Sequence, residues 1–240
     1  MRRYQENYAS QRTQMYDRKS RELKGLRIVK TLGDFFGDDN LKYKKVLDIG
    51  ASTGIIDNVL AKHFKKVTGT DIDKEAIKFA QNKFRSSNLR FEIEDAMKLS
   101  FKKSSFDIVI CTHVYEHVPD PKKLFSEIYR VLKPNGVCYL AAQNKLWPME
   151  AHHDLLFLSY LPKPLADIYI KIFRGKDEYY EHPMSYWELK NVLKKFEINE
   201  YTVAIMLFPK KFGYNLPFFS FLFAPIAKYF APTLFWILEK

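Results

Sequence analysis

The chain has 240 residues, of which 47% are hydrophobic and 28% are charged. Its 39 lysines and arginines outnumber the 28 aspartates and glutamates, which gives a formal net charge of +11. This composition excludes an intrinsically disordered chain, a collagen-like chain and a small disulfide-stabilised scaffold. The excess of positive charge favours anionic partners, such as acidic lipid, phosphorylated substrate or nucleic acid, without choosing among them.

Residues 1–6 are too polar for a signal peptide. The most apolar stretch, residues 216–238, is interrupted by three prolines and a lysine, so the sequence predicts no membrane-spanning helix. Cys111 and Cys138 each lie in an apolar run, which favours buried free thiols in a reducing compartment. We therefore predict a cytoplasmic protein, with attachment to the inner face of the membrane as the alternative.

Residues 1–40 are polar and basic, and we predict that they form an N-terminal helical flap. From Arg18 onward, apolar residues recur at the three-and-four spacing of a helix. Gly33 and residues 37–40 are predicted to end this helix.

Strands and helices are predicted to alternate through residues 41–145, the core of the fold. The predicted strands are residues 45–49, 66–70, 89–93, 106–111 and 137–142, and the predicted helices are residues 54–64, 74–84 and 122–132. Asp73 and Asp120 precede two of these helices as N-caps. The alternation predicts an α/β fold with a mostly parallel sheet and helices on both faces.

Residues 146–186 are not required by such a core, and an insertion after a strand's carboxyl end can cover the ligand crevice as a lid. The side chains that we expect to face a substrate are His152, His153, Tyr180 and His182. The alternative is a packing subdomain with exposed histidines. Residues 187–240 complete the core, with a helix at 187–196, a sixth strand at 198–208 and an antiparallel last strand at 233–238.

Residues 214–231 form an unusually apolar segment within this last part of the chain. Because its prolines interrupt any continuous helical face, we expect it to be buried under the lid. The alternative is contact with a membrane surface, aided by Lys210, Lys211 and Lys228. No RNA-binding module is recognisable, so nucleic acid is not the expected partner.

Ligands of parallel α/β sheets bind beyond the carboxyl ends of the strands, where the strand order reverses. The first strand runs into Asp48-Ile49-Gly50-Ala51-Ser52-Thr53-Gly54, a turn that lets the backbone approach a ligand. The second strand ends at Asp71, an acid placed to accept both hydroxyls of a ribose. Asp95-Ala96 follows the third strand, and Thr112-His113 follows the fourth.

This ordered set resembles the class I S-adenosylmethionine-dependent methyltransferases, particularly the type 11 group that includes quinone-biosynthesis enzymes. The resemblance covers residues 44–145. It rests on Val46–Gly54, Val67–Asp71, Asp95-Ala96, Glu116-His117-Val118-Pro119-Asp120-Pro121 and Phe125–Gly136. The resemblance implies a Rossmann-like, mostly parallel seven-stranded sheet with an antiparallel last strand. It also implies S-adenosyl-L-methionine as the cofactor.

The cofactor-binding residues that the resemblance implies are Asp48, Gly50, Ala51, Ser52, Gly54, Asp71, Ile72, Asp95, Ala96, Thr112 and His113. The Asp48 turn would cradle the methionine part, Asp71 the ribose, and Ile72 and Asp95 the adenine. Thr112 and His113 would lie beside the sulfonium. Ser52 departs from the glycine that the family usually has, which lowers the expected affinity for the cofactor. Because Ser52 and Ile55 also replace two glycines of the dinucleotide pattern, a nicotinamide cofactor is not predicted.

His113, Glu116 and His117 cluster after the fourth strand. Three interpretations remain open. These residues line the pocket, or one of them is a general base, for which His113 and His117 are the candidates, or they are ligands of a divalent ion. We predict no metal. The predicted reaction is methyl transfer to a small-molecule, lipid-linked or glycan acceptor, with oxygen as the favoured atom. The alternative is a non-catalytic cofactor-binding or membrane-associated scaffold of the same fold; the sequence does not predict an oligomeric state.

Overall fold

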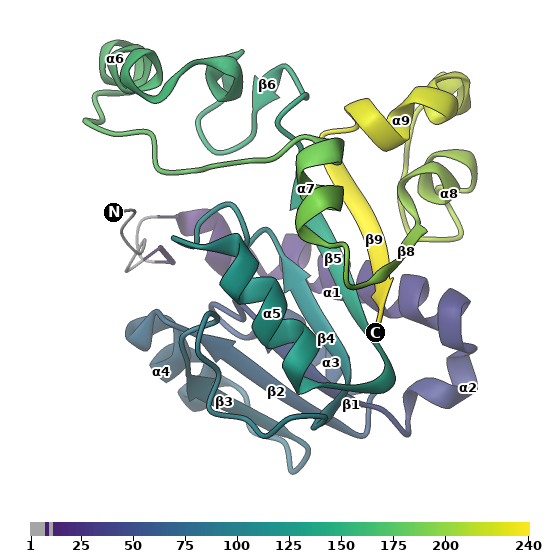
Figure 1. The fold of residues 1–240 in the computed structure, drawn as a ribbon. Helices are drawn as coiled ribbons and strands as arrows, with labels where there is room; N and C mark the ends of the chain where they lie inside the picture. Colours follow the sequence, from purple (N-terminus) through teal and green to yellow (C-terminus); the bar gives the residue numbers. More distant parts are fainter. Residues whose placement is uncertain (1–7, 10–11) are drawn as a thin grey trace.

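A computed structural model describes residues 8–9 and 12–240 of the chain, so the prediction about residues 1–6 lies outside the described part. A single seven-stranded sheet runs through the molecule in the order β3-β2-β1-β4-β5-β9-β8 (Figure 1). Its strands are β1 Lys45–Ile49, β2 Lys66–Asp71, β3 Leu89–Ile93, β4 Phe106–Thr112, β5 Leu132–Gln143, β8 Glu197–Glu200 and β9 Thr233–Glu239.

The pairing of the strands confirms the predicted topology. Neighbours from β3 to β5 pair in parallel, whereas β9 runs antiparallel to both β5 and β8. The strand order reverses between β1 and β4, which are parallel neighbours in the centre of the sheet. The crevice beyond the carboxyl ends of β1 and β4 is therefore where this fold places a ligand.

Helices cover both faces of the sheet (Figure 1). The α-helices are α1 Arg18–Phe36, α2 Asp38–Leu41, α3 Ile55–Leu60, α4 Lys74–Lys83, α5 Pro121–Val131, α6 Lys163–Arg174, α7 Tyr186–Val192, α8 Thr202–Leu207 and α9 Ala224–Phe230. The described residues also include short 3₁₀ helices, η1 Thr13–Tyr16, η2 Leu158–Tyr160 and η3 Phe218–Phe223. One core cluster includes Leu124 of α5 and Leu189 of α7, and the cluster on the opposite face includes Leu32 of α1 and Ile77 of α4. The sheet is thus buried on both sides, as its near-continuous apolar strands predict.

The helices begin where the sequence places their caps. The Asp73 carboxylate accepts from the Ala76 amide, and the Asp120 carboxylate accepts from the amides of Lys122 and Lys123. These bonds satisfy amides that have no partner inside the helix. At the N-terminal helix the prediction was partly wrong, because Gly33 lies inside α1 and the helix continues to Phe36.

The predicted sixth strand was too long. Strand β8 ends at Glu200, and residues 202–207 form helix α8. The reason is local, since the Glu200 carboxylate accepts from the amides of Thr202 and Val203 and so caps the first turn of a helix. The β-branched composition of this stretch favours a strand, but the cap decides its conformation.

Residues 146–186 rise above the carboxyl end of the sheet (Figure 1). They hold a two-stranded sheet, β6 Met149–Glu150 with β7 Leu155–Leu156, together with η2 and α6. Leu158, Ala166 and Ile170 pack with Leu155 and Tyr179 in a small core of their own. We call this segment the lid.

The expected burial of residues 214–231 under the lid was wrong. The side chains of η3 are largely exposed, and Phe218 retains 91% of its accessible surface. Elements η3 and α9 pack against α8 and against each other instead of against the lid. Within the described part of the chain, no helix is both long and apolar enough to cross a bilayer.

Candidate active site

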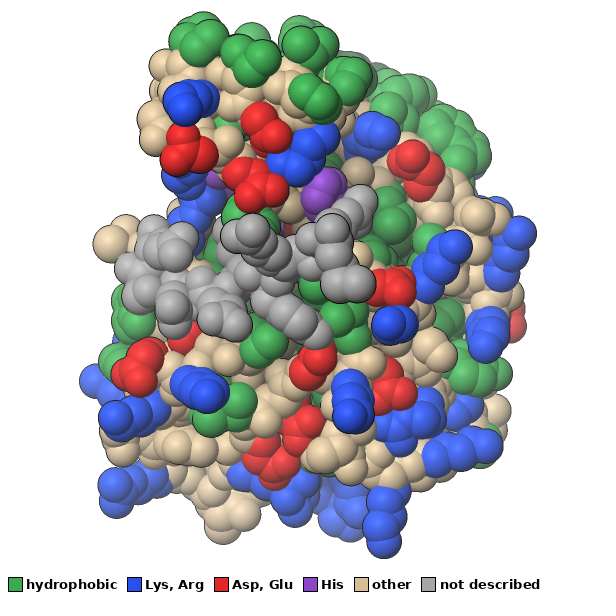
Figure 2. Space-filling view, turned by 60° about the vertical axis from the view of Figure 1, so that its left-hand side comes forward, with side chains coloured by type: hydrophobic (Ala, Val, Ile, Leu, Met, Phe, Trp, Pro, Cys, Tyr) green, Lys and Arg blue, Asp and Glu red, His purple; other side chains and the backbone are tan. Residues whose placement is uncertain are grey.

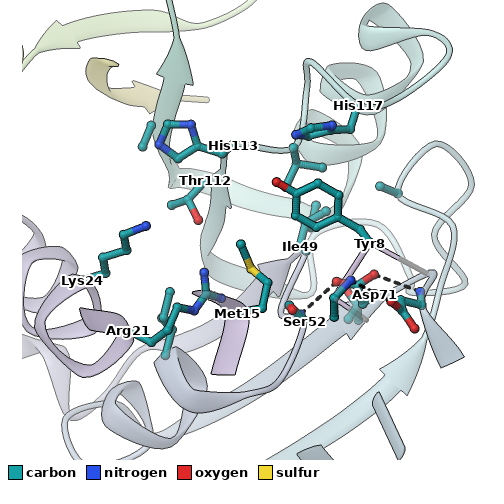
Figure 3. A pocket seen from close by; sticks show the side chains of 18 of the residues that line it. Tyr8, Met15, Arg21, Lys24, Ile49, Ser52, Asp71, Thr112, His113 and His117 are labelled. Atoms are coloured by element: carbon teal, nitrogen blue, oxygen red, sulfur yellow. Dashed lines mark hydrogen bonds between the residues drawn. The ribbon is translucent and has the colours of Figure 1, made fainter. Parts of the chain in front are cut away.

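A cavity of about 490 Å³ opens at the carboxyl ends of the strands, at the point where the strand order reverses. Figure 3 shows side chains entering it from three directions: from the strand-end turns, from helix α1, and from the loop between β4 and α5. The volume lies within the range of small-molecule and cofactor sites. The predicted residues that line this cavity are Gly50, Ser52, Asp71, Ile72, Asp95, Ala96, Thr112, His113, His117 and His152.

The turn after β1 brings its backbone to the edge of the cavity through residues with positive φ. Gly50 has a φ of 80°, and a Cβ on it would stand 2.5 Å from a methyl group of Val114. Ser52 has a φ of 52°, a conformation that costs a residue with a Cβ on the order of 1 kcal/mol. The Ser52 hydroxyl is buried without a hydrogen-bond partner among the described residues, although Ser52 lines the cavity.

Asp71 is held at the end of β2 by two backbone bonds. One carboxylate oxygen accepts from the Ser52 amide at 2.8 Å, and the other accepts from the Asp73 amide at 2.9 Å (Figure 3). Burial raises the pKa of Asp71 above its usual range, against the lowering effect of these amides. Each oxygen keeps a further lone pair for a donor in the cavity.

Another part of the cavity wall comes from the ends of β2 and β3. Ile72 follows β2, Asp95 and Ala96 lie in the turn after β3, and all three line the cavity. The Asp95 carboxylate accepts from the Met97 amide at 2.8 Å, which fixes the orientation of the acid. An apolar side chain beside an oriented acid suits a flat aromatic ring with an amino group.

Helix α1 contributes two cations that the sequence analysis did not identify. Arg21 is 8% exposed and lines the cavity, and Lys24 lines it three residues later (Figure 3). The Nε atom of Arg21 is buried without a hydrogen-bond partner among the described residues. Two cations at the rim suit the carboxylate of an amino-acid ligand. Their spacing in the sequence indicates that these residues share a face of α1. It does not indicate that this face lies against the crevice, which is why the sequence analysis missed them.

Behind Arg21, two buried carboxyl groups face each other. Asp48 at the end of β1 is 2% exposed and Asp57 of α3 is fully buried. Burial and mutual repulsion raise the pKa of Asp48, and burial raises the pKa of Asp57 as well. Asp48, together with Ala51 and Gly54, does not line the cavity itself. These three residues therefore belong to the buried structure next to the cavity and not to its lining.

At the opposite side of the cavity, His113 is paired with a buried acid. Its Nδ1 lies 3.3 Å from Oε1 of Glu116, which is fully buried. Burial alone would raise the pKa of Glu116, but the His113 hydrogen bond and the neighbouring imidazoles hold it below its usual value. His113 has a φ of 53°, a left-handed conformation that turns the chain sharply after β4.

The lid adds His152 to this group, next to His117 from the β4–α5 loop. Their ring centroids lie 4.8 Å apart, and the Tyr8 hydroxyl lies 3.2 Å from Nδ1 of His152. Burial lowers the pKa of His117 and lowers the pKa of His152 to about 3, so both rings are neutral at neutral pH. The ligand atoms of Glu116, His117 and His152 lie within 4.8 Å of one another, close enough to hold a metal ion. The prediction that the protein uses no metal remains a prediction.

The other predicted lid residues lie elsewhere. His153 is buried inside the lid, where its Nε2 lies 3.0 Å from Oε2 of Glu181. His182 lines a second cavity of about 380 Å³ between the lid and α7, and Tyr180 lines neither cavity. Of the four candidate substrate-binding residues, the structure therefore brings only His152 to the main cavity.

The residues that line the cavity fit S-adenosylmethionine. An acid with free lone pairs would suit its ribose, an oriented acid and an apolar side chain would suit its adenine, and two cations would suit its methionine carboxylate. The unpartnered polar atoms of Ser52 and Arg21 are what a polar ligand would satisfy.

Comparison with known proteins supports the resemblance that the sequence predicts. Residues 47–140 match the methyltransferase domain family. This match lies in the part of the chain that carries the sequence resemblance, so it agrees with the predicted family, the class I S-adenosylmethionine-dependent methyltransferases. The match supports the predicted cofactor, S-adenosyl-L-methionine.

Curated relatives match the same region. The ubiquinone biosynthesis O-methyltransferase of Coxiella burnetii is 34% identical over 107 residues, which cover 44% of this chain and 46% of the relative. The enzyme of the same name from Psychrobacter arcticus is 36% identical over 107 residues, 42% of each chain. The match thus spans less than half the length of these relatives.

Solved structures match a larger part of the chain. A methyltransferase from Methanosarcina mazei covers 83% of this chain and 93% of its own, with a TM-score of 0.56 and 24% identity. The match to a structure from Listeria monocytogenes covers 92% of this chain and 99% of the Listeria chain, with a TM-score of 0.60 and 16% identity. At these identities the likeness shows the fold alone, which agrees with the predicted Rossmann-like architecture.

Proposed function

We propose that this protein is an S-adenosylmethionine-dependent methyltransferase that methylates an oxygen atom of a small-molecule acceptor bound beneath the lid. One observation carries the proposal: the cofactor crevice and the imidazoles of the β4–α5 loop and the lid share one cavity. The O-methyltransferase names of the curated relatives support oxygen as the accepting atom.

The strand-end residues would hold and orient the cofactor. Asp71 would accept from both ribose hydroxyls, and Asp95 from the adenine amino group, with Ile72 against the ring. Arg21 and Lys24 would bind the methionine carboxylate. Bound S-adenosylmethionine supplies an electrophilic methyl group, so the main task of the protein is alignment, which can supply several kcal/mol of the barrier.

His113 is the better of the two predicted general bases. A proton taken up at its Nε2 would be balanced by the Glu116 carboxylate behind Nδ1. His117 is disfavoured in this role because burial lowers its pKa and so weakens it as a base. Glu116 is a positioning residue, since it orients the His113 ring and acts through it.

His152 and Tyr8 would recognise the acceptor. Burial raises the pKa of Tyr8 to about 12, so its hydroxyl stays protonated at neutral pH, and we assign it as the donor to Nδ1 of His152. The proton of the neutral imidazole is then on Nε2, which is buried without a partner among the described residues. This N–H would donate to an oxygen of the acceptor and hold it in the cavity.

Isothermal titration calorimetry with S-adenosylmethionine and S-adenosylhomocysteine tests the cofactor site first. Micromolar binding is expected, and the absence of heat at millimolar cofactor with folded protein would refute the proposal. Release of S-adenosylhomocysteine in the presence of cell extract then separates an enzyme from the scaffold alternative. His113→Gln should abolish release while cofactor binding is retained, and an unchanged rate would rule out the base.

A further inference from the structure

Exposed apolar side chains gather at the end of the molecule farthest from β1, on two elements distant in sequence. Figure 2 shows hydrophobic side chains along the upper edge of the molecule, over the lid and toward η3 and α9. We call this surface the apolar face. Its exposed members are Leu165, Ile168, Ile172 and Phe173 on α6 and Phe218, Phe219, Phe221, Leu222, Phe223, Ile226 and Phe230 on η3 and α9.

Helix α6 is apolar on both of its sides. Ala166 and Ile170 are fully buried in the small core of the lid. Leu165, Ile168 and Ile172 lie at three-and-four spacing on a different side, and Ile172 retains 70% of its accessible surface. A helix that only covers a lid in water has a polar outer side, so an exposed second apolar stripe is not what a surface helix of this kind needs.

The segment formed by η3 and α9 exposes even more apolar side chains than α6 does. Of the six residues of η3, Phe-Phe-Ser-Phe-Leu-Phe, the serine alone is buried. The Ser220 hydroxyl donates to the Pro217 carbonyl at 2.6 Å, and the five large side chains are exposed. A contiguous exposed patch of this kind marks an interaction surface.

The charges around the apolar face identify its partner. Residues 202–230 contain three lysines, Lys210, Lys211 and Lys228, and no acid; Lys211 forms an ion pair with Asp34 of α1, so Lys210 and Lys228 carry the net positive charge of this segment. On the lid, Asp167 and Asp177 each form an ion pair with a lysine of α6. Lysines therefore outnumber acids in the segment that contributes most of the apolar face, and apolar residues combined with lysines are the pattern of an element that lies in the interface of an anionic bilayer.

We infer that the apolar face docks on the surface of an anionic lipid bilayer. Helix α6 and the η3–α9 segment lie at the same end of the molecule, so both meet one plane (Figures 1 and 2). Aromatic side chains and lysines are the residues that proteins place at the boundary between headgroups and acyl chains. The inference is independent of methyl transfer, because none of these side chains lines the cofactor cavity.

Co-sedimentation of the full chain with vesicles tests the inference. Vesicles of phosphatidylglycerol and phosphatidylcholine should carry the protein into the pellet, and vesicles of phosphatidylcholine alone should carry much less. Raising the salt to about 1 M shortens the Debye length to about 3 Å and should weaken the attachment. Phe218→Ser should reduce the partition coefficient on the order of tenfold, since one aromatic ring no longer enters the apolar layer.

Tyr43→Ser is the matched control, since Tyr43 is also exposed but lies between α2 and β1, away from the apolar face. It should sediment as the wild type does. The combined change Phe218→Ser, Phe219→Ser and Leu222→Ser should abolish attachment and leave the melting temperature and cofactor binding unchanged, because these side chains are exposed.

Three results would overturn the inference. The first is wild-type protein that stays in the supernatant with anionic vesicles, and the second is a triple variant that still sediments. The third is a dimer in sedimentation velocity that the triple variant abolishes while no vesicle binds, which would assign the apolar face to a second copy of the chain.

Discussion

The two sides of the cavity bury polar groups that respond to burial in opposite ways. On the crevice side, burial raises the pKa of Asp48, Asp57 and Asp71. On the lid side, burial lowers the pKa of His117 and His152. In both cases burial disfavours the charged form. On the crevice side this form is a carboxylate, and on the lid side it is an imidazolium.

This difference corresponds to what each side is proposed to bind. Buried carboxylates are relieved by a ligand that brings positive charge, and S-adenosylmethionine carries a sulfonium and an ammonium group. Neutral imidazoles hydrogen-bond an uncharged acceptor without repelling the positively charged cofactor beside it. A substitution or a change of pH should therefore affect the two sides with different signs.

The largest expected effect is on the crevice side. Asp71→Ala should weaken binding of S-adenosylmethionine by about 1.5–3 kcal/mol, the cost of losing hydrogen bonds to a charged acceptor. Calorimetry measures the change, and Asp39→Ala, which removes an exposed acid of α2, is the control. Equal affinities for the two variants would show that the ribose is bound elsewhere.

On the lid side, acid should destabilise the protein through His152. Its pKa is about 3 in the folded state and about 6.5 when unfolded, so the unfolded state binds more protons between these values. Stability is then complete above pH 6.5 and is lost as the pH falls, by about 2 kcal/mol at pH 5. Melting temperatures of the wild type and His152→Gln at pH 8 and pH 5 test this. A variant with the same pH dependence as the wild type would contradict the assignment.

The buried acids Asp48 and Asp57 should give stability the opposite dependence on pH. Because the folded-state pKa of Asp57 is raised, its contribution to stability is lost as the pH rises. Asp57→Asn removes the buried acid and should stabilise the protein by about 1–2 kcal/mol at pH 8 and less at pH 5. Urea unfolding at the two pH values measures this, with exposed Asp39→Asn as the control. A destabilised variant at pH 8 would mean that the Asp57 carboxylate is needed as an ion.

The smallest effect concerns the turn after β1. Ser52→Gly removes a Cβ from a residue with a φ of 52° and should stabilise the fold by up to about 1 kcal/mol. Cofactor affinity should stay equal or rise a few-fold, because the Ser52 amide that binds Asp71 is retained. A fall in affinity would instead show that the Ser52 hydroxyl binds the ligand. Thermal unfolding and calorimetry on the same samples distinguish these outcomes.

The sequence determined the sheet and one side of the cavity because their signals are local. Apolar runs placed β1 and β3 at their observed bounds, and the cap residues Asp73 and Asp120 began the right helices. Once the strands are parallel, their carboxyl ends must meet at one edge, so Asp71 and His113 come to one cavity without further information.

Only the tertiary structure decided which distant segments complete the cavity. Arg21 from α1 reaches the crevice because α1 packs against α3, and His152 meets Tyr8 because the lid lies above the strand ends. It also decided that η3 and α9 stay exposed. Composition shows that a segment is apolar, but burial depends on whether another element is positioned to cover it, and the lid packs around a core of its own.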